Sequence, residues 1–319
     1  MNTDRRSLLL GLAATSLMPA AAVAQDRLAI TATTGMIADA ARRIGGDLVD
    51  VTALMGAGID PHSYRQTRTD IVALTRADLV LWNGLYLEAQ MEDFLLRLGK
   101  GSQVVAIGES VPKDKLLHHA EYEGRPDPHI WMVPDIWRHA VTAAQAAMTA
   151  ARPDLSAAFE ANATAYLAEI DALSTYASKA LEKVPEDTRV LVTAHDAFSY
   201  FGRQFGFEVL GIQGISTESE AGLQRIGALV DTLVSRRIEA VFVETSVSDR
   251  NIRALIEGAA AQGHTVRIGG ELYSDAMGEP GTYEGTYIGM IDHNVTVIAR
   301  ALGAEIPVAG MSGKLTGGA

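Results

Sequence analysis

Short apolar runs alternate with helical or turn-like segments along most of this 319-residue chain. In the first half the apolar runs are Leu28–Thr33, Val49–Leu54, Leu79–Trp82 and Val104–Ile107. In the second half they are Val190–Thr193, Glu208–Ile212, Ala240–Val243 and Thr265–Ile268. Such runs are typical of buried strands. A repeated order of one strand followed by one helix predicts a parallel sheet. The pattern therefore predicts two α/β halves of similar size.

A long stretch without glycine or proline, Asp154–Val184, separates the two halves. Apolar residues recur there at three- and four-residue steps from Phe159 to Leu181, which predicts one continuous amphipathic helix. About 30 residues of helix would extend roughly 45 Å, enough to cross a two-lobed protein. A long helix inside one larger domain is the alternative. The matching rhythm of the two halves favours a rigid helical connection between lobes.

The first 24 residues have the pattern of a secretory signal peptide. Arg5 and Arg6 precede the apolar run Leu8–Ala22, and Ala22-Val23-Ala24 offers a small-x-small cleavage site. The run is too short and too rich in alanine and glycine to be a good membrane anchor. The arginine pair also resembles a twin-arginine signal, and we favour an ordinary Sec signal. We expect cleavage after Ala24 and a soluble periplasmic protein, because the chain has no cysteine to carry a lipid.

Without the signal peptide at 1–24, we predict an N-terminal lobe at 25–153, a connecting helix at 154–185 and a C-terminal lobe at 186–319. The formal net charge of −12 argues against a nucleic-acid partner, whose phosphates need surfaces rich in Lys and Arg. The absence of cysteine excludes thiolate ligands. Any metal site must therefore be built from His, Asp and Glu.

Two Asp-Pro-His tripeptides are the most distinctive candidate chemistry. His62 ends one of them, in a turn after Val49–Leu54, and His129 ends the other, before a helical run. Proline fixes its own φ and restrains the residue before it, so each imidazole is held on a stiff turn. An Asp two residues back is placed to orient a ring N–H or to cap a helix. This preorganisation suits a metal ligand, although either tripeptide alone is also compatible with a simple capping turn.

The second half adds two further candidates. His195 directly follows the predicted strand Val190–Thr193, and α/β folds place their ligands at the C-terminal ends of parallel strands. Asp275 follows the last predicted strand; a lone Asp in a loop is more often an N-cap, but here it ends the fourth β/α unit. Three imidazoles and one carboxylate suit zinc and tolerate manganese, whereas calcium and magnesium prefer mostly oxygen ligands.

The remaining histidines are weaker candidates. His118 and His119 lie in a polar stretch, which we interpret as a solvated loop rather than a metal-collecting one. His139 and His264 have the pattern of surface residues. His293 stands at the head of a predicted helix, where a packing or capping role is expected.

The segments around the candidate residues resemble the zinc, manganese and iron solute-binding proteins of ABC transporters, and are most similar to the TroA type. The similarity extends over nearly the whole chain after the signal peptide. The similar segments are Gly58–His62, Trp82–Leu85, Asp127–Trp131, Val192–Phe198, Gly214–Ala221 and Gly269–Gly278.

This resemblance implies two lobes, each with a four-stranded mainly parallel sheet, joined by a long rigid helix. It implies one Zn²⁺ or Mn²⁺ in the cleft between the lobes, held by His62, His129, His195 and Asp275. It also implies an ABC permease and its cytoplasmic ATPase as partners. We therefore expect a monomeric periplasmic receptor that delivers the metal to the permease, and no enzymatic activity.

Two departures from the family pattern bear on the metal. Many manganese and iron members carry Glu where this chain has His195, whereas many zinc members carry a longer His-rich loop than Pro112–Asp127. The cargo therefore stays open between zinc and manganese.

Three rival functions are compatible with parts of this pattern. A zinc hydrolase is one, but four protein ligands leave no open coordination position and no His-Glu-x-x-His motif is present. An adhesin-like interaction protein on the same fold is the second, and the missing lipid anchor weakens it. A receptor for a chelated metal is the third, and it would need a roomier cleft lined by aromatic residues.

Overall fold

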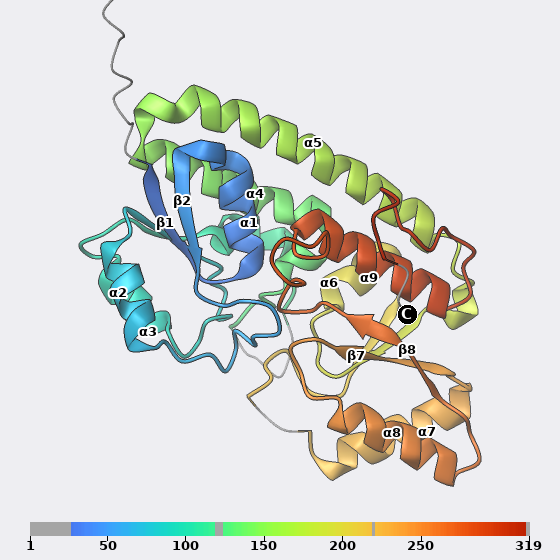
Figure 1. The fold of residues 1–319 in the computed structure, drawn as a ribbon. Coiled ribbons are helices and arrows are strands. Elements are labelled where there is room, and N and C mark those ends of the chain that lie inside the picture. The colour runs from blue at the N-terminus through green and yellow to red at the C-terminus, as the bar shows by residue number, and fades with distance from the viewer. Residues whose placement is uncertain (1–26, 119–123, 219–220, 317–319) are drawn as a thin grey trace, which may run out of the picture.

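The computed structural model describes residues 27–118, 124–218 and 221–316 (Figure 1). The predicted signal peptide and His119 lie outside these residues. Within them, no helix is both long enough and apolar enough to span a membrane.

The N-terminal half is built on one sheet of four parallel strands in the order β2-β1-β3-β4. The strands are β1 (Leu28–Ala32), β2 (Val49–Ala53), β3 (Leu79–Trp82) and β4 (Val104–Ala106), each within one residue of its predicted end. All four residues of β3 are buried. Because successive side chains of a strand point to opposite faces, both faces of the sheet are covered at β3, as its continuous apolar run predicts.

The helices of this half follow the strands along the chain. They are α1 (Gly35–Gly45), α2 (Arg68–Arg76), α3 (Glu92–Leu98) and α4 (Pro134–Ala151). A 3-10 turn, Ile130–Met132, lies directly before α4. The helices of the C-terminal half are α6 (Ser199–Phe205), α7 (Leu223–Arg236), α8 (Arg250–Ala261) and α9 (Tyr287–Ala301).

The C-terminal half carries four parallel strands that pair two by two. They are β5 (Val190–Thr193), β6 (Glu208–Gly211), β7 (Ala240–Glu244) and β8 (Arg267–Leu272), paired as β5-β6 and β7-β8. β5 and β7 lie side by side, so the four strands repeat the order of the N-terminal sheet, but no ladder joins these two in the described residues. The predicted single four-stranded sheet is therefore split. Just beyond β5, the N–H of His195 donates to the Glu244 carboxylate rather than to a strand carbonyl.

The last strand, β8, extends four residues beyond the predicted Thr265–Ile268. Gly269 and Gly270 have the composition of a break, yet both lie inside the strand. A Cβ on Gly270 would come within 2.4 Å of Val297 on α9, and one on Gly269 within 2.8 Å of Phe242 on β7. The strand therefore runs through because glycine lets its backbone pass close to both neighbours.

The long helix α5, Ser156–Leu181, connects the two halves (Figure 1). Its 26 residues extend about 39 Å, and one 3-10 turn, Pro153–Leu155, leads into it. It packs against α1 and α4 in one half and α9 in the other. The predicted apolar stripe is buried along its whole length, at Phe159, Ala163, Tyr166, Ile170, Leu173, Ala177 and Leu181.

Candidate metal centre

The fold brings the four candidate ligands His62, His129, His195 and Asp275 together between the two halves. One ligand atom from each lies within 4.8 Å of the others. His129 and His195 are 0% exposed, and His62 and Asp275 are 2% exposed. Three of them follow strands, β2, β5 and β8, and His129 immediately precedes the turn that leads into α4. The convergence joins two ligands from each half of the chain.

The distances fit a single small cation. His62 Nε2 lies 3.2 Å from His129 Nε2. The carboxylate of Asp275 lies 3.4 Å from His129 Nε2 and 3.2 Å from His195 Nε2. A tetrahedral ion with ligands at about 2.1 Å needs its ligand atoms about 3.4 Å apart. In the part of the chain that the structure describes, no hydrogen bond satisfies His195 Nε2 or either oxygen of Asp275, and buried polar atoms of this kind need a partner.

His129 is held by the tripeptide that contains it. Asp127 Oδ1 accepts both the backbone N–H of His129, at 2.9 Å, and its ring Nδ1–H, at 2.7 Å. A ring that donates from Nδ1 presents the lone pair of Nε2 to the centre. The predicted orienting role of the Asp two residues back is confirmed here.

His195 is held by Glu244, a residue that the sequence reasoning missed. The Glu244 carboxylate accepts the backbone N–H of His195 at 2.9 Å and its ring Nδ1–H at 2.6 Å. Glu244 is the last residue of β7 and is only 4% exposed. A signal was present, because a carboxylate that ends a buried apolar strand lies at the same sheet edge as His195.

His62 is held differently. Asp60 Oδ1 accepts the backbone N–H of His62 at 2.9 Å, but among the described residues no carboxylate accepts a hydrogen bond from its ring. In this first tripeptide the Asp caps the turn and does not orient the imidazole.

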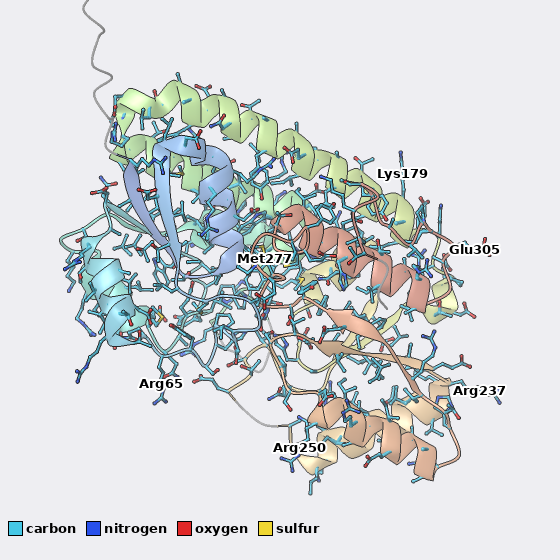
Figure 2. The ribbon with its side chains drawn as sticks, viewed as in Figure 1. Arg65, Lys179, Arg237, Arg250, Met277 and Glu305 are labelled. Carbon is cyan, nitrogen blue, oxygen red and sulfur yellow. The ribbon has the colours of Figure 1, made fainter. Side chains whose placement is uncertain are left out.

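Packing across the halves positions the loop that carries Asp275. Met277 lies near the middle of the molecule, whereas the labelled charged side chains lie around its outside (Figure 2). Met277 is buried against Gly35, the first residue of α1, where an added Cβ would come within 3.2 Å of the Met277 methyl carbon. The indole N–H of Trp131 donates to the carbonyl of Ser274 at 2.7 Å. Asp275 is thus fixed from both sides by residues of the N-terminal half.

The electrostatics of the four groups are unequal. Burial pulls the pKa of His129 down, but Asp127 and Asp275 more than offset this and raise it to about 9. Burial is likewise outweighed at His195, whose pKa is raised well above its usual value by Glu244 and Asp275. At His62 burial prevails, and the pKa falls to about 4. Burial opposes ionisation of Asp275, yet the histidines hold its pKa well below the usual range. A metal that binds here near neutral pH must therefore displace protons.

The other described histidines lie outside this cluster. His118 is exposed and forms an isolated bridge with Pro126. His139 is half-buried rather than fully on the surface. His264 is also half-buried, and its Nε2 hydrogen-bonds the carbonyl of Ile238 at 2.8 Å. His293 packs against Tyr273 and hydrogen-bonds the carbonyl of Glu271 at 3.0 Å.

Comparison with known proteins gives the class of this two-lobed fold. Residues 30–301 match the family described as ZnuA, the periplasmic component A of a zinc-uptake complex. The chain belongs to this family, as the sequence motifs predict.

Three relatives show that the metal named for members of this family varies. The chain is 49% identical over 280 residues to the manganese-binding lipoprotein MntA of Bacillus subtilis, covering 88% of this chain and 91% of that protein. It is 42% identical over 281 residues to the zinc-binding protein TroA of Treponema pallidum, covering 88% and 91%. The TroA structure matches with a TM-score of 0.85 at 41% identity, covering 87% of this chain and 99% of that one. The iron-binding protein YfeA of Yersinia pestis is 31% identical over 296 residues, covering 90% and 93%.

Proposed function

We propose that this protein is an extracytoplasmic receptor that captures one divalent transition-metal ion and delivers it to an ABC permease driven by a cytoplasmic ATPase. The observation that carries the proposal is the buried convergence of three imidazole nitrogens and one carboxylate within 4.8 Å. Membership of the zinc-uptake family supports the role in transport, because this family consists of transport receptors rather than enzymes.

The ion would be held by His62, His129, His195 and Asp275. Their spacing suits tetrahedral coordination, and the carboxylates of Asp127 and Glu244 keep two of the rings in the correct tautomer. Four protein ligands complete such a site and leave no position for a substrate, which is the arrangement of a binding site rather than of a hydrolase. A hydrolase is therefore not favoured, and membership of a family of transport receptors favours transport over an adhesin role.

We propose Zn²⁺ or Mn²⁺ as the cargo. The relatives named above bind manganese, zinc or iron, so family membership alone does not choose among these metals. Three imidazoles favour zinc, and intrinsic affinity favours zinc over manganese at any such site. Binding strength in vitro therefore has to be separated from transport in the cell.

We further propose that residues 1–24 are removed on export and that the receptor acts as a periplasmic monomer. Its lobes would be 25–153 and 186–319, with the connecting helix at 154–185. The division into two lobes is supported by α5, which packs against helices of both halves and carries a buried stripe from end to end.

Calorimetric titration of the exported, chelator-stripped protein with ZnCl₂ and with MnCl₂ tests the function. We expect one ion per chain, and metal uptake by cells should fall when the gene is deleted. Failure of both metals to bind at a stoichiometry near one would refute the proposal. Ester and peptide substrates should not be turned over, and turnover that depends on the bound metal would favour the hydrolase.

A further inference from the structure

One candidate ligand borders a cavity. Among the residues that the structure describes, the cavity of about 140 Å³ beside His62 is lined by no other member of the ligand cluster. Leu85, Tyr86, Ala89 and the cationic Arg125 form a wall from the N-terminal half, and Ile215, Ser216 and Glu218 form a wall from the C-terminal half. Tyr86 is 39% exposed and Ala89 is also exposed, so the cavity reaches the surface of the molecule.

The N-terminal wall of this cavity is built rigidly. Gly84, Leu85 and Tyr86 all have positive φ, at 74°, 55° and 66°, which costs energy at the two residues that are not glycine. The buried carboxylate of Glu88 holds this turn by accepting the backbone N–H groups of Asn83, at 2.8 Å, and Gly84, at 3.1 Å. A passage along the cavity would therefore open by movement of His62 or of the C-terminal wall.

His62 is also the least restrained of the three imidazoles. The rings of His129 and His195 donate to buried carboxylates at 2.7 and 2.6 Å, and neither residue is exposed. The ring of His62 has no such partner within the described residues. Rotation of His62 toward the cavity would break fewer hydrogen bonds than rotation of either other ring.

The turn that carries His62 is tied to the other half of the molecule through Asp60. Its Oδ1 accepts the backbone N–H of His62 at 2.9 Å. Its Oδ2 accepts the hydroxyl of Ser63 at 2.7 Å and, from the C-terminal half, the hydroxyl of Thr217 at 2.6 Å. A second contact between the halves, from the side-chain amide of Gln90 to Glu218, lies close to the same wall.

Two contacts between the halves near the centre of the molecule are more deeply buried. The Trp131 indole donates to Ser274 across the centre, and the Tyr287 hydroxyl donates to the carbonyl of Trp131 at 2.9 Å. Both of these hydrogen bonds are buried, whereas the one between Thr217 and Asp60 is only partly buried. Exposed hydrogen bonds with few packed neighbours open first, so the contact beside the cavity should open before the two contacts at the centre.

We propose that the metal ion enters and leaves past His62 through this cavity, and that the Thr217–Asp60 hydrogen bond is a latch that sets how long the ion stays bound. The inference rests on the proposed function, because it takes the four-residue cluster as the metal site. Thr217 is a positioning residue: it acts on the ion through Asp60 and the backbone of His62.

The latch is tested by the rate at which Zn²⁺ leaves the loaded protein into an excess of a chromogenic chelator. Thr217→Val keeps the shape of the side chain and removes the hydroxyl, so release should become about five- to tenfold faster. Thr217→Ser keeps the hydroxyl and should release zinc at nearly the wild-type rate. Thr232→Val, the same change at a helix hydroxyl of α7 that donates to the carbonyl of Ala228, is the matched control and should change nothing.

The route is tested by narrowing the cavity with Ala89→Phe. Uptake and release of Zn²⁺ should both slow by a similar factor while Kd stays nearly constant, because a bulkier wall changes the passage and not the ligands. Ala228→Phe, at an exposed position on α7, is the matched control. A change in only one of the two rates, and therefore in Kd, would contradict the route.

The outcomes separate the latch from the proposed function. Zinc release from Thr217→Val at the wild-type rate, or from Thr217→Ser as fast as from Thr217→Val, would overturn the latch. Unchanged rates in Ala89→Phe would overturn the route. In those cases a wild-type protein that still binds one Zn²⁺ per chain keeps the proposed function, whereas a wild-type protein that binds none overturns both.

Discussion

The two halves of the molecule supply two candidate ligands each, but they position them by different means. In the N-terminal half, His62 and His129 stand on Asp-Pro-His turns, and each Asp binds the backbone of its own histidine. In the C-terminal half, His195 depends on Glu244, which is 49 residues further along the chain and on another strand. One half thus holds its histidines through local sequence, and the other through the packing of β5 beside β7.

This difference has a consequence for how each half tolerates change. A short turn with proline keeps its geometry even when neighbouring strands shift, because φ is fixed covalently. The pairing of His195 with Glu244 exists only while two strands without a continuous ladder stay in place. The C-terminal side of the centre should therefore be the more sensitive to perturbation of the fold.

The largest expected effect comes from removing a ligand on either side. We predict that His129→Ala and His195→Ala each weaken zinc binding at least about 100-fold, because a closed four-ligand site becomes incomplete. Calorimetric titration measures this, with His139→Ala as the control outside the cluster. Losses of equal size in all three variants would show that the assignment of the ligands is wrong.

The change of zinc affinity with pH should be nearly as large as the loss caused by removing a ligand, and it should involve histidines from both halves. The pKa of His129 is raised to about 9, and that of His195 is also raised. Without metal, both rings are therefore doubly protonated and cationic at neutral pH. Protons therefore compete with the metal below about pH 9, and the competition strengthens as the pH falls. We predict a loss of affinity of about tenfold or more per pH unit between pH 8 and 6.

Titration in buffers of different ionisation enthalpy provides the check. More than one proton should be released per metal bound at pH 7. A heat of binding that is the same in every buffer would mean that the rings of His129 and His195 are already neutral. Their pKa values would then not be raised relative to that of His62.

A smaller effect distinguishes the local support from the distant one. We predict that Asp127→Asn and Glu244→Gln each lower zinc affinity about tenfold, because the amide no longer stabilises the metal-bound tautomer as a carboxylate does. Glu244→Gln should also lower the melting temperature of the metal-free protein more than Asp127→Asn does, because Glu244 joins two strands. Thermal unfolding followed by circular dichroism tests this order, and the reverse order would contradict the contrast between the halves.

Local patterns were sufficient to predict much of the architecture. Seven strands lie at the predicted apolar runs, β8 overlaps its predicted run only at Arg267 and Ile268, and the buried stripe of α5 matches the predicted helix face. The Asp-Pro-His turns are equally local, because proline and a side chain two residues away define their geometry. These features depend on the period of burial and on backbone restraint, and both are encoded within a few residues.

Tertiary structure decided the contacts between segments. The two glycines of β8 have the composition of a break, but the segment pairs with β7, and the close approach of Val297 and Phe242 explains why glycine is needed there. The partnership of Glu244 with His195 and the hydrogen bond from Thr217 to Asp60 join residues far apart in sequence. The amino-acid sequence by itself was enough to propose His62, His129, His195 and Asp275 as the metal ligands. How each is oriented, and which one faces a cavity, depends on distances between packed segments, which no local pattern contains.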